Sequence, residues 1–247
     1  MKLNIGLQIY TVRNKMDLGY DEVIKNIAEA GYAGIEMTYD PKNGEEVGNL
    51  LKKYSLKGLG AHIGIEAIEN DLDTVIGFLE NIGAKCCAIP WIGGDAISTE
   101  EKTAATAKRF DAAAKKLADM GYTLGFHNHT HEFETKFNGK TVIEVFFENS
   151  QHLKFQIDAG WAYNGGADVP AVLNKLGGRL FNNIHIKDID DTRTPTEIGS
   201  GNVDYKTVIA TAANLGVEWG VVEQDACVNY PPFESVKVSY DYIKTIN

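Results

Sequence analysis

The chain has 247 residues, 44% hydrophobic and 23% charged, so it can bury a sizeable core as one large domain or two small ones. Its 34 acidic and 24 basic residues give a formal net charge of −10, which offers little general affinity for nucleic acid or for an anionic membrane surface. We therefore expect a small, neutral or weakly charged substrate.

Membrane and disulfide signals are also missing from the sequence. No apolar run approaches the ~20 residues that cross a bilayer, and residues 1–10 lack the apolar stretch of a signal peptide. The 3 cysteines form no Cys-x-x-Cys pair, which argues against a disulfide framework or a thiolate zinc site. We expect a soluble cytoplasmic protein with buried cysteines.

A repeated unit of helix, glycine and short β-rich run organises the chain. The unit occurs in Ala28–Met37, Leu79–Pro90, Leu117–His127 and Asn214–Gln224. The glycines within it are Gly31, Gly83, Gly121 and Gly216. Glycine suits the left-handed conformation that ends a helix, so each unit predicts a helix followed closely by a strand.

In chain order, the sequence predicts eight strands alternating with eight helices. The predicted strands are Leu3–Gln8, Ile35–Met37, Gly58–His62, Cys86–Ile89, Thr123–His127, Phe155–Asp158, Ile184–Lys187 and Val221–Glu223. The predicted helices are Tyr20–Ala30, Glu45–Tyr54, Asp71–Ile82, Ser98–Met120, Val142–Asn149, Val169–Leu176, Tyr205–Leu215 and Phe233–Ile246. This alternation favours an α/β fold, a (β/α)8 TIM barrel formed by residues 1–247 as a single domain. An open doubly wound sheet is the alternative, which the even distribution of strands disfavours.

Polar residues gather at the carboxyl ends of the predicted strands, where the active site of such a barrel lies. These ends carry Gln8, Glu36, His62, Pro90 with Trp91, His127 to His129, Asp158, His185 with Lys187, and Glu223. A purely structural barrel needs no such convergence of titratable and hydrogen-bonding groups. The sequence therefore predicts a functional site at this mouth of the barrel.

Three of these residues could ligate a metal ion. Asp158, His185 and Glu223 each follow or interrupt an apolar strand. Two carboxylates and one imidazole suit a divalent ion that accepts oxygen and nitrogen ligands, such as Mn²⁺, Co²⁺, Mg²⁺ or Zn²⁺. The alternative is structural: Asp158 caps a turn, His185 bonds a carbonyl group, and Glu223 pairs with Lys187.

Half of the chain's six histidines lie in the segment GFHNHTHEF. If the fifth strand persists, alternation places His127 and His129 on one face and Asn128 on the other. Glu132 lies where a loop could turn it toward the ion, and we expect His131 to be a solvated loop residue.

His185 and Lys187 should share a face of the seventh strand, which would bring Lys187 into the pocket. A nearby cation and a low dielectric would depress the lysine pKa and make it a donor to substrate oxygen or a proton carrier. A salt bridge to Asp188 or Glu223 is the alternative. The segment Glu197–Tyr205 weakly resembles a phosphate-cradling loop before a helix that Asp204 could cap.

Over essentially its whole length the chain resembles the xylose-isomerase-like barrels known as sugar phosphate isomerases/epimerases. That family also includes tagatose epimerases, inosose dehydratases and type IV endonucleases. The resemblance is carried by GLQIYTVR, GIEM, GAHIG, HNHTHEF, QIDAGWA, HIKD with IGSGNVD, and VVEQD. The combination of HNH..EF, DAGWA and HIKD is typical of the sugar-active branch.

The resemblance implies that Asp158, His185 and Glu223 bind one divalent metal ion. The epimerases carry their fourth ligand, a glutamate, at the tip of the fifth strand, where this chain has His127. Either Glu132 supplies the carboxylate from the loop or a fifth-strand histidine replaces it, and we favour Glu132. The expected catalytic residues are His129, His127, Glu223 and Lys187, and the expected substrate-binding residues are Gln8, Glu36, His62, Trp91, Trp161 and Lys187. A homodimer or tetramer is also compatible with the resemblance.

The expected reaction is proton abstraction beside a carbonyl group of a sugar or cyclitol, through an enediolate, by an isomerase or epimerase. The same first step serves a lyase or dehydratase acting on a keto-sugar, an inosose or a 3-keto-glycoside. A type IV endonuclease-like DNA repair hydrolase is disfavoured, because the chain is acidic and offers ligands for about one ion. A non-catalytic sugar-binding barrel is the remaining alternative.

Overall fold

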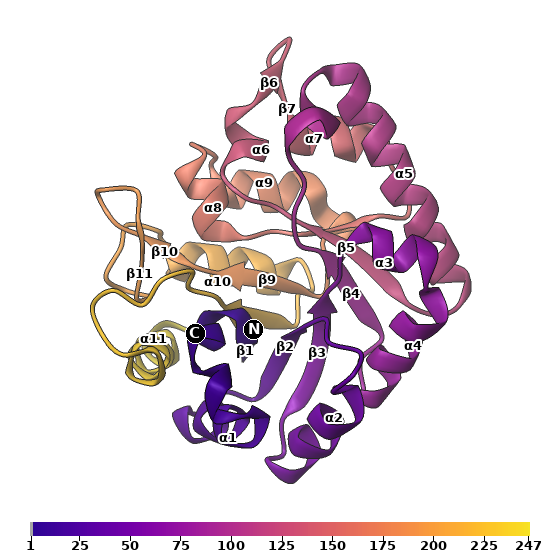
Figure 1. The fold of residues 1–247 in the computed structure, drawn as a ribbon. Coiled ribbons are helices and arrows are strands. Elements are labelled where there is room, and N and C mark those ends of the chain that lie inside the picture. The colour runs from indigo at the N-terminus through magenta and orange to yellow at the C-terminus, as the bar shows by residue number, and fades with distance from the viewer. Residues whose placement is uncertain (1) are drawn as a thin grey trace.

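The computed structural model describes residues 2–247, and its eight-stranded parallel sheet runs in the order β8-β5-β4-β3-β2-β1-β12-β9 (Figure 1). The strands are β1 (Asn4–Gln8), β2 (Gly34–Thr38), β3 (Lys57–His62), β4 (Cys86–Ile89), β5 (Thr123–His127), β8 (Lys154–Gln156), β9 (Asn183–Ile186) and β12 (Trp219–Val222). Each of the eight predicted strands overlaps one of these, and the predicted TIM barrel is confirmed. Of the expected domain 1–247, Met1 lies outside the described residues.

Helices surround the strands on the outside of the barrel (Figure 1). Those matching the eight predicted helices are α1 (Tyr20–Ala30), α2 (Gly44–Lys53), α4 (Leu72–Asn81), α5 (Glu100–Asp119), α7 (Val142–Glu148), α9 (Val169–Leu176), α10 (Tyr205–Asn214) and α11 (Pro232–Ile246). The four repeated glycines do adopt positive φ angles, 109° at Gly31, 70° at Gly83, 81° at Gly121 and 85° at Gly216. They end helices as the sequence predicts.

Short elements in the loops were not predicted. They are η1 (Ile9–Leu18), α3 (Ile65–Asn70), η2 (Gly94–Ile97), α6 (His131–Glu134), α8 (Ala159–Asn164), η3 (Gly177–Arg179) and the antiparallel pairs β6 (Lys136–Phe137) with β7 (Lys140–Thr141) and β10 (Asp188–Ile189) with β11 (Pro195–Thr196). One or two turns are too few for a 3.6-residue period to show in the sequence. Two of these elements, α6 and α8, begin beside the candidate site.

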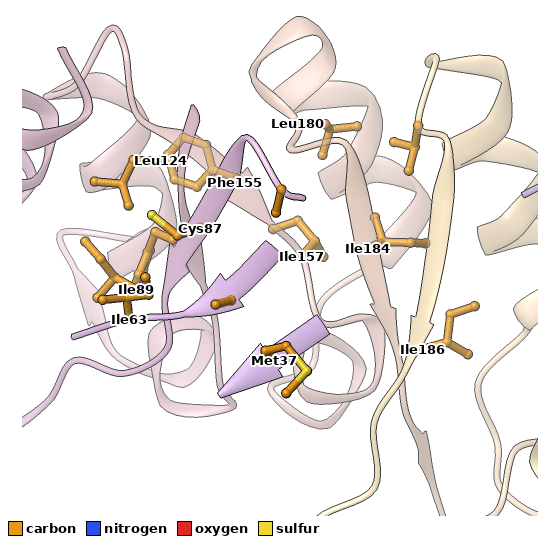
Figure 2. Close-up of a cluster of buried hydrophobic side chains, with 14 of the residues drawn as sticks. Met37, Ile63, Cys87, Ile89, Leu124, Phe155, Ile157, Leu180, Ile184 and Ile186 are labelled. Atoms are coloured by element: carbon orange, nitrogen blue, oxygen red, sulfur yellow. The ribbon is translucent and has the colours of Figure 1, made fainter. Parts of the chain in front are cut away.

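Strand residues alternate between an apolar layer and a polar interior. In β9, Ile184 and Ile186 belong to the hydrophobic core, as do Phe155 in β8 and Leu124 in β5 (Figure 2). The intervening residues of these strands point into the barrel, where polar side chains from different strands meet. The apolar layer packs the sheet against its helices, which leaves the polar interior free to form a site.

The ring of strands is completed at a thin seam between β8 and β9. No continuous ladder joins these two strands in residues 2–247. Two isolated parallel bridges link each strand to the segment beside the other, Phe155 of β8 with Leu180 and Asp158 with His185 of β9. The amide of His185 donates to the carbonyl oxygen of Ile157 at 2.9 Å. Strand β8 is shorter than predicted and ends at Gln156, because Asp158 turns to cap α8.

The two described ends of the chain meet beneath the barrel. The amide of Leu3 donates to Asn247 Oδ1 at 2.9 Å, and Asn247 Nδ2 donates to the carbonyl oxygen of Leu3 at 2.8 Å. Across residues 2–247, none of the helices combines the length and the apolar character needed to span a membrane.

Candidate active site

The carboxyl ends of the strands open into a cavity of about 450 Å³. Its lining residues are Tyr10, Thr38, His62, Pro90, Trp91, His127, His129, Glu223 and Asp225. This volume lies in the range of small-molecule sites. Among the cavities in the described part of the chain, this one collects histidines and carboxylates from several strands.

Four buried side chains at the floor of this cavity form a candidate metal centre. His127, Asp158, His185 and Glu223 each offer one ligand atom, and these atoms all lie within 4.8 Å of one another. Two of the polar atoms, His127 Nδ1 and Asp158 Oδ2, are buried with no hydrogen-bond partner among the described residues. Orphaned polar atoms are costly in a protein interior, so the set fits a divalent ion with mixed nitrogen and oxygen ligands.

His185 is oriented by carboxylates on both sides of its ring. Its Nδ1 lies 3.0 Å from Glu223 Oε2, and its Nε2 lies 2.6 Å from Glu36 Oε2. Burial lowers the pKa of His185, but the two carboxylates outweigh burial and raise it to about 10. A ring with one nitrogen held by a carboxylate and the other facing a second ligand residue is the arrangement that orients metal-binding histidines.

Glu36 anchors a polar network beneath the cavity. Its carboxylate accepts hydrogen bonds from Gln8 at 2.8 Å, Gln156 at 2.6 Å and Asn183 at 3.3 Å. Burial raises the Glu36 pKa, but the histidines His62 and His185 more than compensate, leaving it below its usual range. Gln8 and Glu36 are buried and do not line the cavity, so the structure places these expected substrate-binding residues behind the ligands.

Gln156 and Asn183 were missed by the sequence analysis, although a signal existed. Each lies two residues before a predicted ligand, Gln156 before Asp158 and Asn183 before His185. Period-two alternation therefore directs all four side chains into the barrel. His62, an expected substrate-binding residue, lines the cavity and lies 2.9 Å from Gln156 Oε1.

Asp158 uses one carboxylate oxygen for a structural contact and leaves the other without a hydrogen bond. Its Oδ1 accepts from the amide of Trp161 at 2.8 Å and so caps α8, while Oδ2 has no hydrogen bond. The side chain of Asn128 holds the Asp158 backbone, accepting from its amide at 2.9 Å. Burial, partly offset by the charge of Lys187, raises the pKa of Asp158 to about 6.

Lys187 is fully buried among carboxylates. Its Nζ lies 3.3 Å from Asp158 Oδ2, 3.2 Å from Glu223 Oε2 and 2.5 Å from Asp225 Oδ2. Burial lowers the lysine pKa, as expected, but these carboxylates outweigh burial and raise the pKa above its usual range. Of the two expected salt bridges, the structure forms the one to Glu223; Asp188 instead accepts backbone amides.

His129 lines the cavity as a neutral imidazole. Burial, with the nearby Lys187 charge, lowers its pKa to about 3. Its ring packs edge-on against Trp91, with ring centroids 4.7 Å apart, and its Nδ1 has no hydrogen-bond partner in the part of the chain described. An imidazole that lines a cavity with one ring nitrogen free of hydrogen bonds is placed to exchange a proton with a bound substrate.

Glu132 lies outside the cluster of ligand atoms. Its Oε2 accepts from the amide of His129 at 2.8 Å, and its Oε1 lies 3.1 Å from His131 Nε2. The short helix α6 turns this carboxylate back onto its own segment. The structure thus puts His127, rather than Glu132, beside Asp158, His185 and Glu223, and His131 is a helix residue rather than a loop residue.

The two tryptophans expected to bind substrate lie in different places. Trp91 is 58% exposed and lines the cavity. Trp161 does not line the cavity, and its ring centroid lies 4.4 Å from Lys187 Nζ. Trp91 is thus placed to contact a ligand, and Trp161 is placed to contact Lys187.

The glycine-rich loop before α10 holds a carboxylate of the protein itself. Asp188 Oδ2 accepts from the amides of Gly199 at 2.9 Å and Gly201 at 3.1 Å, and Asp188 Oδ1 accepts from Val203 at 3.1 Å. These are the amides that a phosphate would need, so the structure does not support the expected phosphate cradle. Asp204 does cap α10, accepting from the amide of Thr207 at 3.2 Å.

Several solved structures share this fold. A sugar phosphate isomerase/epimerase from Parabacteroides distasonis has a TM-score of 0.85 and 18% identity, with 98% of this chain and 96% of that chain covered. A probable 3-DHS dehydratase from Bacillus anthracis has a TM-score of 0.77 and 16% identity, covering 100% of both chains. D-allulose 3-epimerase from Methylomonas sp., solved in complex with D-allulose, has a TM-score of 0.71 and 16% identity, covering 100% and 98%.

A comparison with curated protein sequences gave no match. The family model described as xylose isomerase-like TIM barrel matches residues 24–245, which span every strand of the sheet from β2 to β12 and the candidate site except Gln8 and Tyr10. The chain belongs to the xylose isomerase-like TIM barrel family.

Proposed function

We propose that the protein is a metal-dependent isomerase or epimerase of a sugar or cyclitol, acting by proton abstraction beside a carbonyl group. The observation that carries the proposal is the cluster of His127, Asp158, His185 and Glu223 at the floor of the cavity. A binding module has no need of four ligand-capable side chains in one place, two of which carry a buried polar atom without a hydrogen bond among the described residues. The neutral His129 beside the cluster supplies the other half of the chemistry.

A divalent ion held by these four residues would polarise a carbonyl group and its neighbouring hydroxyl, which acidifies the adjacent C–H. In the proposal, His129 takes that proton because its ring lines the cavity and its Nδ1 has no hydrogen-bond partner among the described residues. Glu223 also reaches the cavity, but it already accepts from His185 and Lys187. Trp91 shields one side of the cavity and offers an aromatic face to a sugar ring.

The similar solved structures include an epimerase and a probable dehydratase, and this supports a sugar-like substrate with two candidate outcomes. Reprotonation on the opposite face gives epimerisation, and reprotonation at the neighbouring carbon gives isomerisation. Loss of a β-substituent gives the lyase or dehydratase reaction on a keto-sugar, an inosose or a 3-keto-glycoside. All begin with the same proton abstraction, so the lyase is our second candidate.

The test combines metal analysis with proton exchange. Chelator-treated protein reloaded with Mn²⁺ is incubated in deuterated water with ketoses, inososes and 3-keto-glycosides, and products are followed by NMR. We expect about one bound ion and deuterium at the carbon beside the carbonyl group. The identity of the product then separates epimerase from lyase.

Matched variants assign the roles. Asp158→Asn and Glu223→Gln should lose both the ion and the exchange, whereas His129→Gln should keep the ion and lose the exchange. Retention of full ion content by the first two variants would contradict the ligand set. A well-folded wild-type protein with no ion and no exchange would favour a non-catalytic sugar-binding barrel.

A further inference from the structure

We propose that Lys187 is a tethered cation that competes with the divalent ion for Asp158 and Glu223, and that its existing contacts with Asp225 and Trp161 retain the lysine when the ion binds. The inference rests on the proposed metal site and adds a device that controls its loading. It concerns the lysine's place among the ligand oxygens.

The first observation is that Lys187 contacts the very oxygens that an ion would need. Asp158 Oδ1 is used by the α8 cap, which leaves Oδ2 for an ion, and Oδ2 lies 3.3 Å from Lys187 Nζ. Glu223 Oε2 faces His185 Nδ1 at 3.0 Å and Lys187 Nζ at 3.2 Å. The ammonium group therefore holds together the two carboxylates of the candidate centre.

The second observation is that the same ammonium group already makes two further contacts, which it can keep when an ion takes Asp158 and Glu223. Asp225 Oδ2 lies 2.5 Å from Lys187 Nζ, and the Trp161 ring centroid lies 4.4 Å away on another side. Asp225 also lines the cavity and belongs to no ligand cluster found in residues 2–247. Lys187 can thus keep an ion pair and a cation–π contact after giving up Asp158 and Glu223.

Charge explains why the two cations exclude each other. Asp158 and Glu223 are buried, so without any cation their like charges would repel in a medium of low dielectric. Lys187 removes that repulsion in the metal-free protein. A divalent ion on the same oxygens repels the ammonium group, which favours its movement toward Asp225. Loading of the site therefore exchanges one cation for another.

The test measures Mn²⁺ affinity by calorimetry on chelator-treated protein. Lys187→Met should bind Mn²⁺ at least about tenfold more tightly than the wild type, because the competing state is removed. The metal-free variant should unfold at a lower temperature, and its gain in melting temperature on adding Mn²⁺ should exceed that of the wild type. Lys175→Met removes an exposed lysine paired with Glu144 and is the matched control. It should leave the Mn²⁺ affinity unchanged.

Asp225→Asn provides the second arm, which also serves if Lys187→Met folds poorly. Loss of the alternative partner should weaken Mn²⁺ binding by about tenfold. In the Lys187→Met background the same change should have little effect, because no lysine remains to be relocated. Equal effects of Asp225→Asn in both backgrounds, or unchanged or weaker binding by Lys187→Met, would overturn the competition.

The outcomes separate this inference from the proposed function. Mn²⁺ binding by the wild type with no gain in Lys187→Met leaves the metal centre standing and removes the competition. Binding by Lys187→Met but not by the wild type supports both, with the lysine dominant. Absence of binding in both proteins, with the fold intact, would remove both.

Discussion

At the scale of single residues, the site depends on which side chains alternation brings into the barrel. Asn183, His185 and Lys187 lie two residues apart along one chain segment, and all three reach the interior network. The period of two was visible in the sequence and predicted this face correctly. The individual partners were not predictable, because hydrogen bonds across the barrel join residues far apart in the chain.

The fourth ligand gives a direct test at this scale. His127→Gln should weaken binding of a divalent ion by at least about tenfold, since it removes a proposed ligand nitrogen. Glu132→Gln should leave the ion affinity within about twofold, because its oxygen contacts the His129 amide and not the cluster. Calorimetric titration of the two variants checks both expectations, and the reverse ranking would restore Glu132 as the ligand.

At the scale of elements, strands and long helices followed from the sequence and short loop elements did not. Glu132 is an example of a prediction that failed because a short helix was not foreseen. The single turn of α6 directs its carboxylate to the backbone amide of His129 instead of toward the cavity. Asp158 shows the converse, because its position before α8 makes it both a helix cap and a candidate ligand. Both outcomes were decided by turns too short to leave a periodic signal.

Asp188 fixes the loop between β11 and α10. Asp188→Asn should lower the free energy of unfolding by about 2 kcal/mol. The asparagine side chain has one acceptor oxygen and one NH2 donor, so it cannot replace a carboxylate that accepts hydrogen bonds from several backbone amides. Urea denaturation measures the loss, and hydrogen exchange should quicken at residues 199–203. A Cβ atom at Gly201 would lie 2.3 Å from Asp188 Oδ1, so the loop also depends on glycine there. Unchanged stability would contradict this role.

The start of α7 predicts a dependence on pH. Glu144 closes a capping box with Thr141, and the pKa of Glu144 is lowered mainly by its contact with Lys175. A lowered folded-state pKa stabilises the protein above the ordinary value of 4.5, and that stabilisation is lost as pH falls below it. Glu144→Gln should therefore cost about 0.5 kcal/mol at pH 7 and progressively less below pH 4.5. Urea unfolding at several pH values checks this, and a loss that grows on acidification would contradict it.

At the scale of the whole molecule, the sequence predicted a closed barrel but not where its closure is thinnest. Even spacing of strands and helices is a property of the entire chain, and it favoured the closed ring over an open sheet. The early end of β8 depends on the competing cap at Asp158, so the seam between β8 and β9 could not be read from composition or period.

Arg179 fastens this seam from outside the strands. Its guanidinium group donates to the carbonyl oxygens of Leu153 and Ser150, both at 2.9 Å. Arg179→Met should lower the free energy of unfolding by about 2 kcal/mol and should speed hydrogen exchange in β8 more than in β3. Arg109→Met, which removes a surface pair with Glu69, is the control and should cost less than about 1 kcal/mol. Equal exchange in β8 and β3 would contradict a weak seam.

The seam has a consequence for the proposed site, because Asp158 and His185 face each other across it as bridge partners. An ion bound by both residues would cross-link the two sides of the seam, so that metal binding and closure of the barrel would be coupled. At a free ion concentration 100 times its dissociation constant, metal binding would raise the free energy of unfolding by about 2.7 kcal/mol. The supply of the ion would then govern both catalysis and how long each barrel remains intact.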